Sequence, residues 1–388
     1  MDILPVNFKV LWFCGAWKER KDDNIVVGCL HFCYKYAIFF LIYEFTIFEV
    51  IELIRTCDRI DEFTEGLFLA STYVTLCLKY ANFLLRKNDV SELLDFLRVK
   101  ICQPRNFTEK MIMETHSRKA KWSTLSFLII SQVTAVGFVI APILGFGKDE
   151  WILPTKSYVP YSVSEIFPYV ATYLQQSAAL FYAVMLNVSF DSLVYGFTIH
   201  ACGQIELICR RLTDNIKISI NSRKRSDATA SIKECVRHHI LVHIFVKKVG
   251  ALFLWTVMVL FFFSMIILCT SIFLISKTKL FSIQFLSMIL YFSSMMLQLF
   301  FYCWYGNELE LKSKSIANSI YFSNWTLITS HERRSLILIM INSQKGLTFS
   351  NKRIFTLSLD TFTWASKLRN QYIHVYGIVY ICGVYFQL

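Results

Sequence analysis

Charged side chains are scarce in this chain and unevenly spread. Asp, Glu, Lys and Arg make up 18% of its 388 residues, whereas soluble domains average roughly a quarter. The charges cluster and leave uncharged apolar runs of about 20 residues or more, the length of helix that crosses a bilayer. With 55% hydrophobic residues and a mean hydropathy of +0.46, the composition argues against a soluble domain. It predicts an all-α membrane protein embedded in a lipid bilayer.

Signatures of several other protein classes are missing as well. The 12 cysteines are scattered without a CxxC pair, which argues against the disulfide framework of a secreted domain. The sequence contains no Walker loop and no nucleophile elbow, so neither nucleotide hydrolysis nor serine catalysis is indicated. The net charge of +12 comes from Lys and Arg between apolar runs, without a basic stripe interleaved with aromatic residues. We therefore expect no nucleic-acid partner.

The apolar runs predict seven transmembrane helices, at about 29–54, 63–85, 123–146, 166–190, 249–276, 280–307 and 357–386. The third to sixth runs contain no Asp, Glu, Lys or Arg, whereas the first contains four of them and the seventh is interrupted by three. The first 28 residues lack the apolar core of a signal peptide, so we expect them to remain in the mature chain.

The loops between these runs differ in their content of basic residues. Lys and Arg number nine in the second loop, ten in the fourth and seven in the sixth, against two in each of the other three loops. Because cytoplasmic loops carry an excess of Lys and Arg, the even-numbered loops are predicted inside. The amino terminus is then cytoplasmic and the carboxyl terminus extracellular, the opposite of a G-protein-coupled receptor.

This topology divides the chain into six segments. They are a cytoplasmic segment at 1–28, helices one to four with an outer cavity at 29–190, a cytoplasmic helical extension at 191–248, helices five and six at 249–307, a cytoplasmic anchor segment at 308–353, and helix seven with an extracellular tail at 354–388. Apolar residues such as Val90, Leu93 and Leu97 repeat at helical spacing in an inner loop. The transmembrane helices are therefore expected to continue into a cytoplasmic helical bundle.

Aromatic and small polar residues occur in the outer halves of four predicted spans and are candidates for lining the outer cavity. They are Leu69, Thr72 and Tyr73 of the second span, Gly137 and Phe138 of the third, Tyr169, Tyr173, Gln176 and Ser177 of the fourth, and Phe285 and Tyr291 of the sixth. Such a lining suits a small apolar ligand with one or two polar atoms. Ordinary helix packing is the alternative explanation for each of these residues.

The string RHHILVH contains His238, His239 and His243. Its second and third histidines lie at i and i+4, so both could face one metal ion. The other five histidines are isolated, so the sequence contains no second histidine cluster. Membrane desaturases use several such clusters to bind metal. We therefore expect no cofactor, and interpret the cluster as hydrogen-bonding groups of the cytoplasmic bundle. A metal-dependent membrane enzyme remains the alternative.

Several strings in consistent order resemble the insect odorant receptors. The similarity begins at Pro168 and Tyr169 and is strongest in FYCWYGNELELKS, with SNW at 323–325 and LSLDTF at 357–362. The combination of GNEL, SNW and LSLDTF is specific, and the matching region covers more than half of the chain. The resemblance implies a non-enzymatic, odorant-binding subunit that assembles with a shared co-receptor into a tetrameric, non-selective cation channel. A volatile odorant would open this channel in the plasma membrane of a sensory neuron.

The resemblance also implies roles for particular residues. Aligned without gaps from LSLDTF, the pore-lining end of the family falls on residues 369–376, where Tyr372 matches a family tyrosine and Val375 an apolar constriction. A ring of such side chains closes a narrow pore by excluding water. Arg369 and Asn370 stand where the family usually has Ser-Tyr. The implied cytoplasmic anchor, where subunits meet, includes His239, Gly306, Asn307, Glu308, Trp325 and Asp360.

A gustatory-type receptor would share this fold and is the nearest alternative function. Receptors of that type usually end in a TYxxxxxQ pattern, to which only Gln371-Tyr372 of this chain is weakly similar. The LSLDTF string favours the odorant branch.

Overall fold

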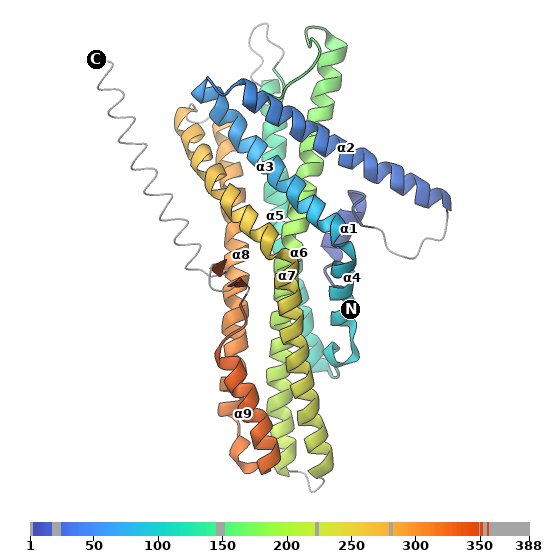
Figure 1. Cartoon of the computed structure of the whole chain (residues 1–388), viewed down its shortest axis with the longest axis vertical. Helices are drawn as coiled ribbons and strands as arrows, with labels where there is room; N and C mark the ends of the chain where they lie inside the picture. Colours follow the sequence, from blue (N-terminus) through green and yellow to red (C-terminus); the bar gives the residue numbers. More distant parts are fainter. Residues whose placement is uncertain are drawn as a thin grey trace, which may run out of the picture.

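Three helices run along most of the length of the protein, which is seen here in a computed structural model (Figure 1). They are α6 (Ile166–Asn221), α7 (Arg225–Lys277) and α8 (Ile283–Tyr321), of 56, 53 and 39 residues. At 1.5 Å per residue a helix as long as α6 extends over roughly 80 Å, whereas the hydrocarbon core of a bilayer is about 30 Å thick. Each of the three helices therefore extends well beyond a membrane that it crosses.

The structure describes residues 3–17, 25–144, 152–221, 225–278, 282–348, 350–351 and 355–356. The other α-helices in these ranges are α1 (Pro5–Phe13), α2 (Ile25–Arg55), α3 (Ile60–Leu85), α4 (Lys87–Arg98), α5 (Phe107–Leu144) and α9 (Ser330–Gln344), with 3₁₀ turns η1 (Lys100–Cys102) and η2 (Trp325–Leu327). Strands β1 (Ser350–Asn351) and β2 (Phe355–Thr356) pair antiparallel, with Ser350 opposite Thr356. The helical architecture predicted from the composition is confirmed.

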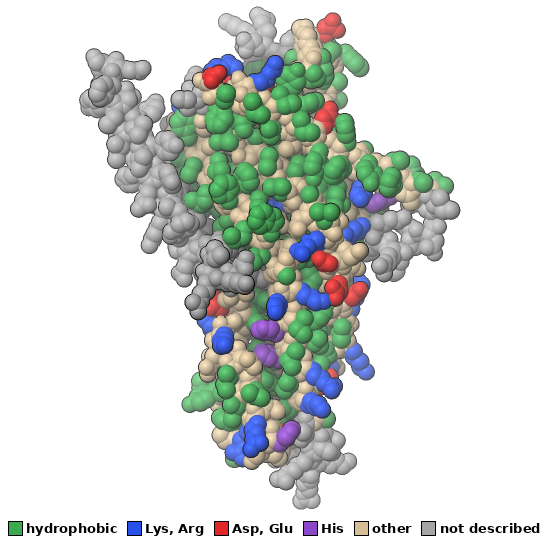
Figure 2. Space-filling view, viewed as in Figure 1, with side chains coloured by type: hydrophobic (Ala, Val, Ile, Leu, Met, Phe, Trp, Pro, Cys, Tyr) green, Lys and Arg blue, Asp and Glu red, His purple; other side chains and the backbone are tan. Residues whose placement is uncertain are grey.

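The two ends of the bundle differ in the chemistry of their surface. Hydrophobic side chains cover most of the upper half of the face in Figure 2, whereas Lys, Arg and His side chains are spread over the lower half. We call these the apolar half and the charged half. Helices α2 and α3 lie in the apolar half, and α4 and α9 lie in the charged half (Figure 1). The apolar half therefore has the surface that a bilayer requires.

Five helical segments of the described chain are long and apolar enough to cross a membrane. They are Glu62–Leu85, Phe107–Ile143, Ile166–Ile220, Ala230–Lys277 and Ile283–Tyr321, and they contain most of the second to sixth predicted spans. Helix α2 covers the first predicted span and carries Lys35, Glu44, Glu49 and Glu52, which lower its hydropathy. The seventh predicted span, at 357–386, lies outside the described residues.

Helix α6 occupies the centre of the bundle and packs most extensively against α5, α7 and α8. In its middle Tyr195 and Phe197 are fully buried, and Phe245 of α7 lies with them in the core. Helix α1 packs against the same stretch, where Asn7 Nδ2 donates a hydrogen bond to Ser192 Oγ at 2.5 Å. Because α6 passes through both halves, it links a binding site in one half to the other half.

Local sequence explains where the helices of the charged half end. Helix α9 begins with a capping box, in which the Thr329 hydroxyl accepts from the Glu332 amide and the Glu332 carboxylate accepts from the Thr329 amide. Gly346, with φ of +66°, follows the end of this helix in a left-handed conformation that glycine adopts at little cost. The charged string at 307–313 does not end α8, which continues to Tyr321.

Candidate ligand-binding site

A cavity lies between α3, α5, α6 and α8 in the apolar half. Its volume is about 80 Å³ for the centre of a water-sized molecule, whereas one buried water needs only roughly 10–15 Å³ by this measure. The wall consists of Phe68, Leu69, Thr72, Tyr73, Leu76, Ser131, Thr134, Ala135, Phe138, Leu180, Ala183, Val184, Asn187, Val188, Tyr291, Ser294 and Met295. Such a space fits a small, mostly apolar molecule.

Three aromatic rings of the cavity wall pack against one another. Phe68 packs edge-on against Tyr291 with ring centroids 5.3 Å apart, and Phe138 lies edge-on to Tyr291 at 6.1 Å. Edge-to-face pairs of this kind add about 0.5–1.5 kcal/mol to the burial of the rings. The Tyr291 hydroxyl also lies 2.5 Å from Thr72 Oγ1, within hydrogen-bond distance. The ring contacts and this hydrogen bond together connect α3 to α8 at the cavity wall.

The remaining hydroxyl groups of the wall are divided between paired and unpaired ones. Ser131 Oγ of α5 lies 2.8 Å from Ser294 Oγ of α8, and the Thr134 hydroxyl donates to the Ile130 carbonyl at 2.9 Å. The Tyr73 hydroxyl is buried without a hydrogen-bond partner among the described residues. A buried unpaired hydroxyl costs free energy, so a ligand that paired with it would regain part of that cost.

Five of the eleven residues predicted to line a cavity lie on this wall: Leu69, Thr72, Tyr73, Phe138 and Tyr291. The other six are not in its lining. Gly137 is next to the wall, where a Cβ atom would lie 2.6 Å from Ser287 Oγ, so glycine allows α5 to approach α8 closely. Phe285 lies in the first turn of α8, where its amide donates to Ser282 Oγ at 3.0 Å.

Four of the predicted residues lie near the amino-terminal end of α6, and two of them contact the segment before that helix. The Tyr169 hydroxyl donates to the Ile152 carbonyl at 2.9 Å, and Gln176 Nε2 donates to Ser157 Oγ at 2.8 Å. The Tyr173 hydroxyl donates to the Val139 carbonyl of α5, and the Ser177 hydroxyl to the Tyr173 carbonyl at 2.7 Å.

Because these contacts occupy the amino-terminal turns, α6 reaches the cavity further along, with Leu180, Ala183, Val184, Asn187 and Val188. In the sequence, the signal for this part of α6 was a small residue, Ala183, followed four positions later by a polar one, Asn187, within an apolar run.

Below the cavity lies a buried ion pair that the sequence reasoning missed. Lys79 Nζ of α3 is 2.6 Å from Asp191 Oδ1 of α6, and the two side chains are 2% and 1% exposed. Lys79 also donates to Asn187 Oδ1 at 2.8 Å, while Gln298 and Tyr302 of α8 donate to Asp191. Charged groups in a membrane segment are costly and commonly mark functional sites. A lysine inside the second apolar run was the available signal.

The sequence model of the 7tm Odorant receptor family matches residues 59–368. This chain belongs to the odorant receptor family. Odorant receptor 46a, isoform A, of Drosophila melanogaster is 24% identical over 314 residues, covering 79% of the receptor and 80% of that relative. Odorant receptor Or2 of Anopheles gambiae is 20% identical over 369 residues, covering 93% of each chain. The family resemblance read from the sequence is confirmed, and the receptor is not an enzyme.

The fold is that of a solved insect receptor. The receptor matches the structure of the insect olfactory receptor OR5 from Machilis hrabei in complex with eugenol over 97% of each chain, with a TM-score of 0.85 at 16% identity. The same OR5 in a second structure gives a TM-score of 0.84. At this identity the likeness establishes the fold alone, which makes the receptor a multi-pass membrane protein.

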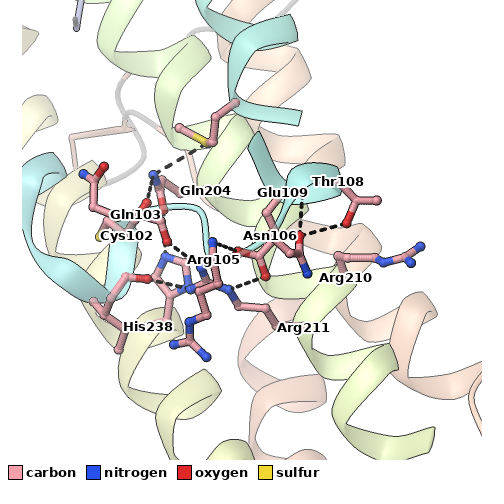
Figure 3. A network of polar contacts seen from close by, with 12 residues as sticks. Cys102, Gln103, Arg105, Asn106, Thr108, Glu109, Gln204, Arg210, Arg211 and His238 are labelled. Carbon is pink, nitrogen blue, oxygen red and sulfur yellow. Dashed lines mark hydrogen bonds and ion pairs between the residues drawn. The ribbon is translucent and has the colours of Figure 1, made fainter. Parts of the chain in front are cut away.

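The charged half of the receptor contains a second buried ion pair, between Arg211 of α6 and Glu109 of α5 (Figure 3). Arg211 Nε and Nη2 donate to the two carboxylate oxygens at 3.0 and 2.7 Å. Arg211 also donates to the carbonyls of Ile101 and Gln103, at 2.5 and 2.8 Å. Burial alone would raise the pKa of Glu109, but the hydrogen bonds from Arg211 and from the Arg105 amide outweigh it and lower that pKa.

His238 of α7 completes this network. Arg211 Nη1 lies 3.4 Å from His238 Nδ1, so Nδ1 is assigned as the acceptor, and Nε2–H donates to Gln204 Oε1 at 2.8 Å. Gln204 Nε2 in turn donates to the Cys102 carbonyl at 3.0 Å. Burial, and then the charge of Arg211, lower the pKa of His238 to about 3. Among the described residues no three His, Cys, Asp or Glu side chains are arranged to hold a metal ion.

The predicted anchor residues are spread over the charged half and its border. His239 and Gly306 are buried, and Trp325 is partly buried in η2. Asn307 is partly buried, and Glu308 lies 3.4 Å from Lys119 Nζ of α5. Asp360, Tyr372 and Val375 lie outside the described residues.

Proposed function

We propose that the receptor is the ligand-binding subunit of an odorant-gated cation channel, and that the odorant binds in the cavity between α3, α5, α6 and α8. The observation that supports this is a largely apolar space of about 80 Å³ in a chain of the odorant receptor family. A volatile compound is small and mainly apolar, and it carries few polar atoms. The wall offers apolar and aromatic surface with a few hydroxyl groups, as such a ligand requires.

Opening of the channel requires the odorant to bind the open state more tightly than the closed one. Helices α5, α6 and α8 line the cavity and continue into the charged half, so a small shift of these helices would be transmitted there. We propose that the charged half is cytosolic, since it contains the Lys- and Arg-rich loops. In this proposal segments 191–248 and 308–353 join subunits, including those of a co-receptor, into a tetramer. Segment 354–388, with Tyr372 and Val375, would line the pore.

Filling the cavity tests the proposal. Ala183 of α6 lies on the cavity wall, whereas Ala179, one turn away, is buried outside the lining. Replacing Ala183 with Leu places about three methyl-sized groups in the ligand's space. With a co-receptor in heterologous cells, we expect Ala183→Leu to raise the half-maximal concentration of the best odorant at least tenfold.

The variant Ala179→Leu is the matched control, because it overpacks the same helix without filling the cavity. Its dose-response curve should stay within about threefold of the wild type at equal surface expression. Equal dose-response curves for both variants would refute the cavity as the odorant site. Absence of current for the wild type across a broad panel of volatile compounds would refute the channel function.

A further inference from the structure

A small polar recess adjoins the odorant cavity. It is lined by Thr72, Thr75, Lys79, Asn187, Leu260, Ser264, Ile267, Met295 and Gln298. Three of these residues, Thr72, Asn187 and Met295, also line the cavity, so the two spaces share part of their walls. The recess measures about 10 Å³ for the centre of a water-sized molecule, which is close to the least that one oxygen-sized group requires.

Two buried polar atoms of the recess residues have no hydrogen-bond partner among the described residues: Gln298 Oε1 and Ser264 Oγ. The side chains belong to residues that are 1% and 0% exposed. In a helix a buried serine commonly donates to the carbonyl four residues earlier. Ser271 does so two turns further along α7, at 2.6 Å from the Ile267 carbonyl, whereas the Ser264 hydroxyl does not. The unpaired atoms require an explanation.

Lys79 supplies a donor to the same place. Its ammonium group has three N–H bonds, of which the contacts with Asp191 and Asn187 use two. Asp191 also accepts from Gln298 Nε2, which fixes the orientation of that amide and leaves Oε1 as its free acceptor. The recess thus combines an acceptor in need of a donor with a fixed cation and a hydroxyl that can donate.

We propose that this recess is a polar subsite that holds the hydroxyl group of an odorant whose apolar part fills the cavity. The inference rests on the proposed odorant-binding function and adds the chemical class of the ligand, small alcohols and phenols. A hydroxyl group donates to Gln298 Oε1 and accepts from Lys79 or Ser264, which satisfies both kinds of group at once. An ether or ester oxygen only accepts, and it leaves Gln298 Oε1 unpaired.

The difference between these ligands follows from the cost of an unpaired buried acceptor. That cost, together with the hydrogen bond lost, makes a site built for a hydroxyl reject an analogue that lacks it. A bound water satisfies the same atoms when no ligand is present. In that case the hydroxyl of an alcohol displaces the water and replaces its bonds, whereas an ether or hydrocarbon does not.

Odorant-evoked currents in cells that co-express a co-receptor test the subsite. The probes are a small aromatic alcohol, its methyl ether, and the hydrocarbon in which a methyl group replaces the hydroxyl. For the wild type we expect the alcohol to act at concentrations about tenfold lower than the other two compounds. In Ser264→Ala the advantage of the alcohol over the hydrocarbon should fall by about threefold or more, with the potency of the hydrocarbon unchanged.

Ser271→Ala is the matched control on the same helix, and surface labelling confirms equal expression. Equal potency of alcohol and ether in the wild type overturns the subsite, as does a Ser264→Ala effect that is the same for all three compounds. Those results leave the odorant-gated function intact if other volatile compounds evoke current. No current from any compound overturns the proposed function itself.

Discussion

The two buried ion pairs of the receptor are alike in burial and different in their surroundings. The side chains of Lys79 and Asp191 are 2% and 1% exposed, and those of Arg211 and Glu109 are 4% each. In the charged half the guanidinium of Arg211 contacts the carboxylate, two backbone carbonyls and a histidine. In the apolar half the ion pair borders a recess in which other polar atoms remain unpaired.

This difference indicates what each pair does. Burying two charges costs free energy that their attraction regains only when further hydrogen bonds satisfy both groups. The Arg211 network meets that condition and connects η1, α5, α6 and α7, which suits a structural role. In the Lys79 network the Asp191 carboxylate has its hydrogen bonds, whereas polar atoms at the recess have no partner among the described residues. Incomplete satisfaction beside a cavity leaves hydrogen-bonding capacity for a ligand.

Removing Arg211 should have the largest effect on stability. The variant Arg211→Leu leaves the Glu109 carboxylate buried with only the hydrogen bond from the Arg105 amide among the described residues, and breaking a buried pair in this way costs about 3–5 kcal/mol. We expect a loss of surface expression and a lower melting temperature of the purified protein in detergent.

Arg210 is the matched control, because its side chain is 53% exposed and pairs with Asp214 at the surface. Exposed pairs contribute roughly 0–1 kcal/mol, so Arg210→Leu should behave nearly like the wild type. Equal losses in the two variants would contradict a structural role that is specific to the Arg211 network.

Removing Lys79 should destabilise the receptor less. In Lys79→Met the Asp191 carboxylate keeps its hydrogen bonds from Gln298 and Tyr302, so we expect a cost of about 2–3 kcal/mol, below that of Arg211→Leu. Adding Asp191→Asn removes the unpaired charge and should restore part of the melting temperature. A double variant that is no more stable than Lys79→Met would show that the two charges are not coupled.

Much of the fold was readable from the sequence because a bilayer imposes a simple rule. Long uncharged runs must be helices, and most of each of the third to sixth spans lies within α5 to α8. Helix α6 continues past residue 191 to Asn221, as expected from the repeat of Ile199, Ile205, Ile208 and Leu212 at helical spacing. Charge within a run obscured the first span, where α2 carries Glu44 and Glu49.

The lining of the candidate site could be predicted from the sequence only in part. Thr72 and Tyr73 were predicted because an aromatic and a hydroxyl on one helical face in mid-membrane suggest a lining. The register of α6 against its neighbours could not be predicted, because it depends on how residues 152–165 cover the amino-terminal turns of that helix. Tyr169 and Gln176 are used in that contact. The Lys79–Asp191 pair joins residues 112 apart, and no local pattern reveals such a contact.

A smaller effect should distinguish the two networks by pH. The pKa of His238 is lowered to about 3 in the folded receptor, from an unfolded value of about 6.5. The unfolded chain therefore binds the extra proton first, and the stability that the neutral imidazole contributes is complete above pH 6.5 and is lost as the pH falls toward 3. A proton on Nδ1 would face the guanidinium of Arg211, 3.4 Å away.

At pH 5.5, one unit below the unfolded value, the loss is about 1 kcal/mol. We expect the wild type to lose more melting temperature than His238→Gln between pH 7.5 and 5.5, because glutamine does not titrate in this range. His243 lies exposed on the same helix, and His243→Gln should keep the wild-type pH dependence. If His238→Gln also keeps the wild-type pH dependence, the network does not hold the imidazole neutral. The hydrogen bonds of the Arg211 network would then be less complete than the contrast with the Lys79 network requires.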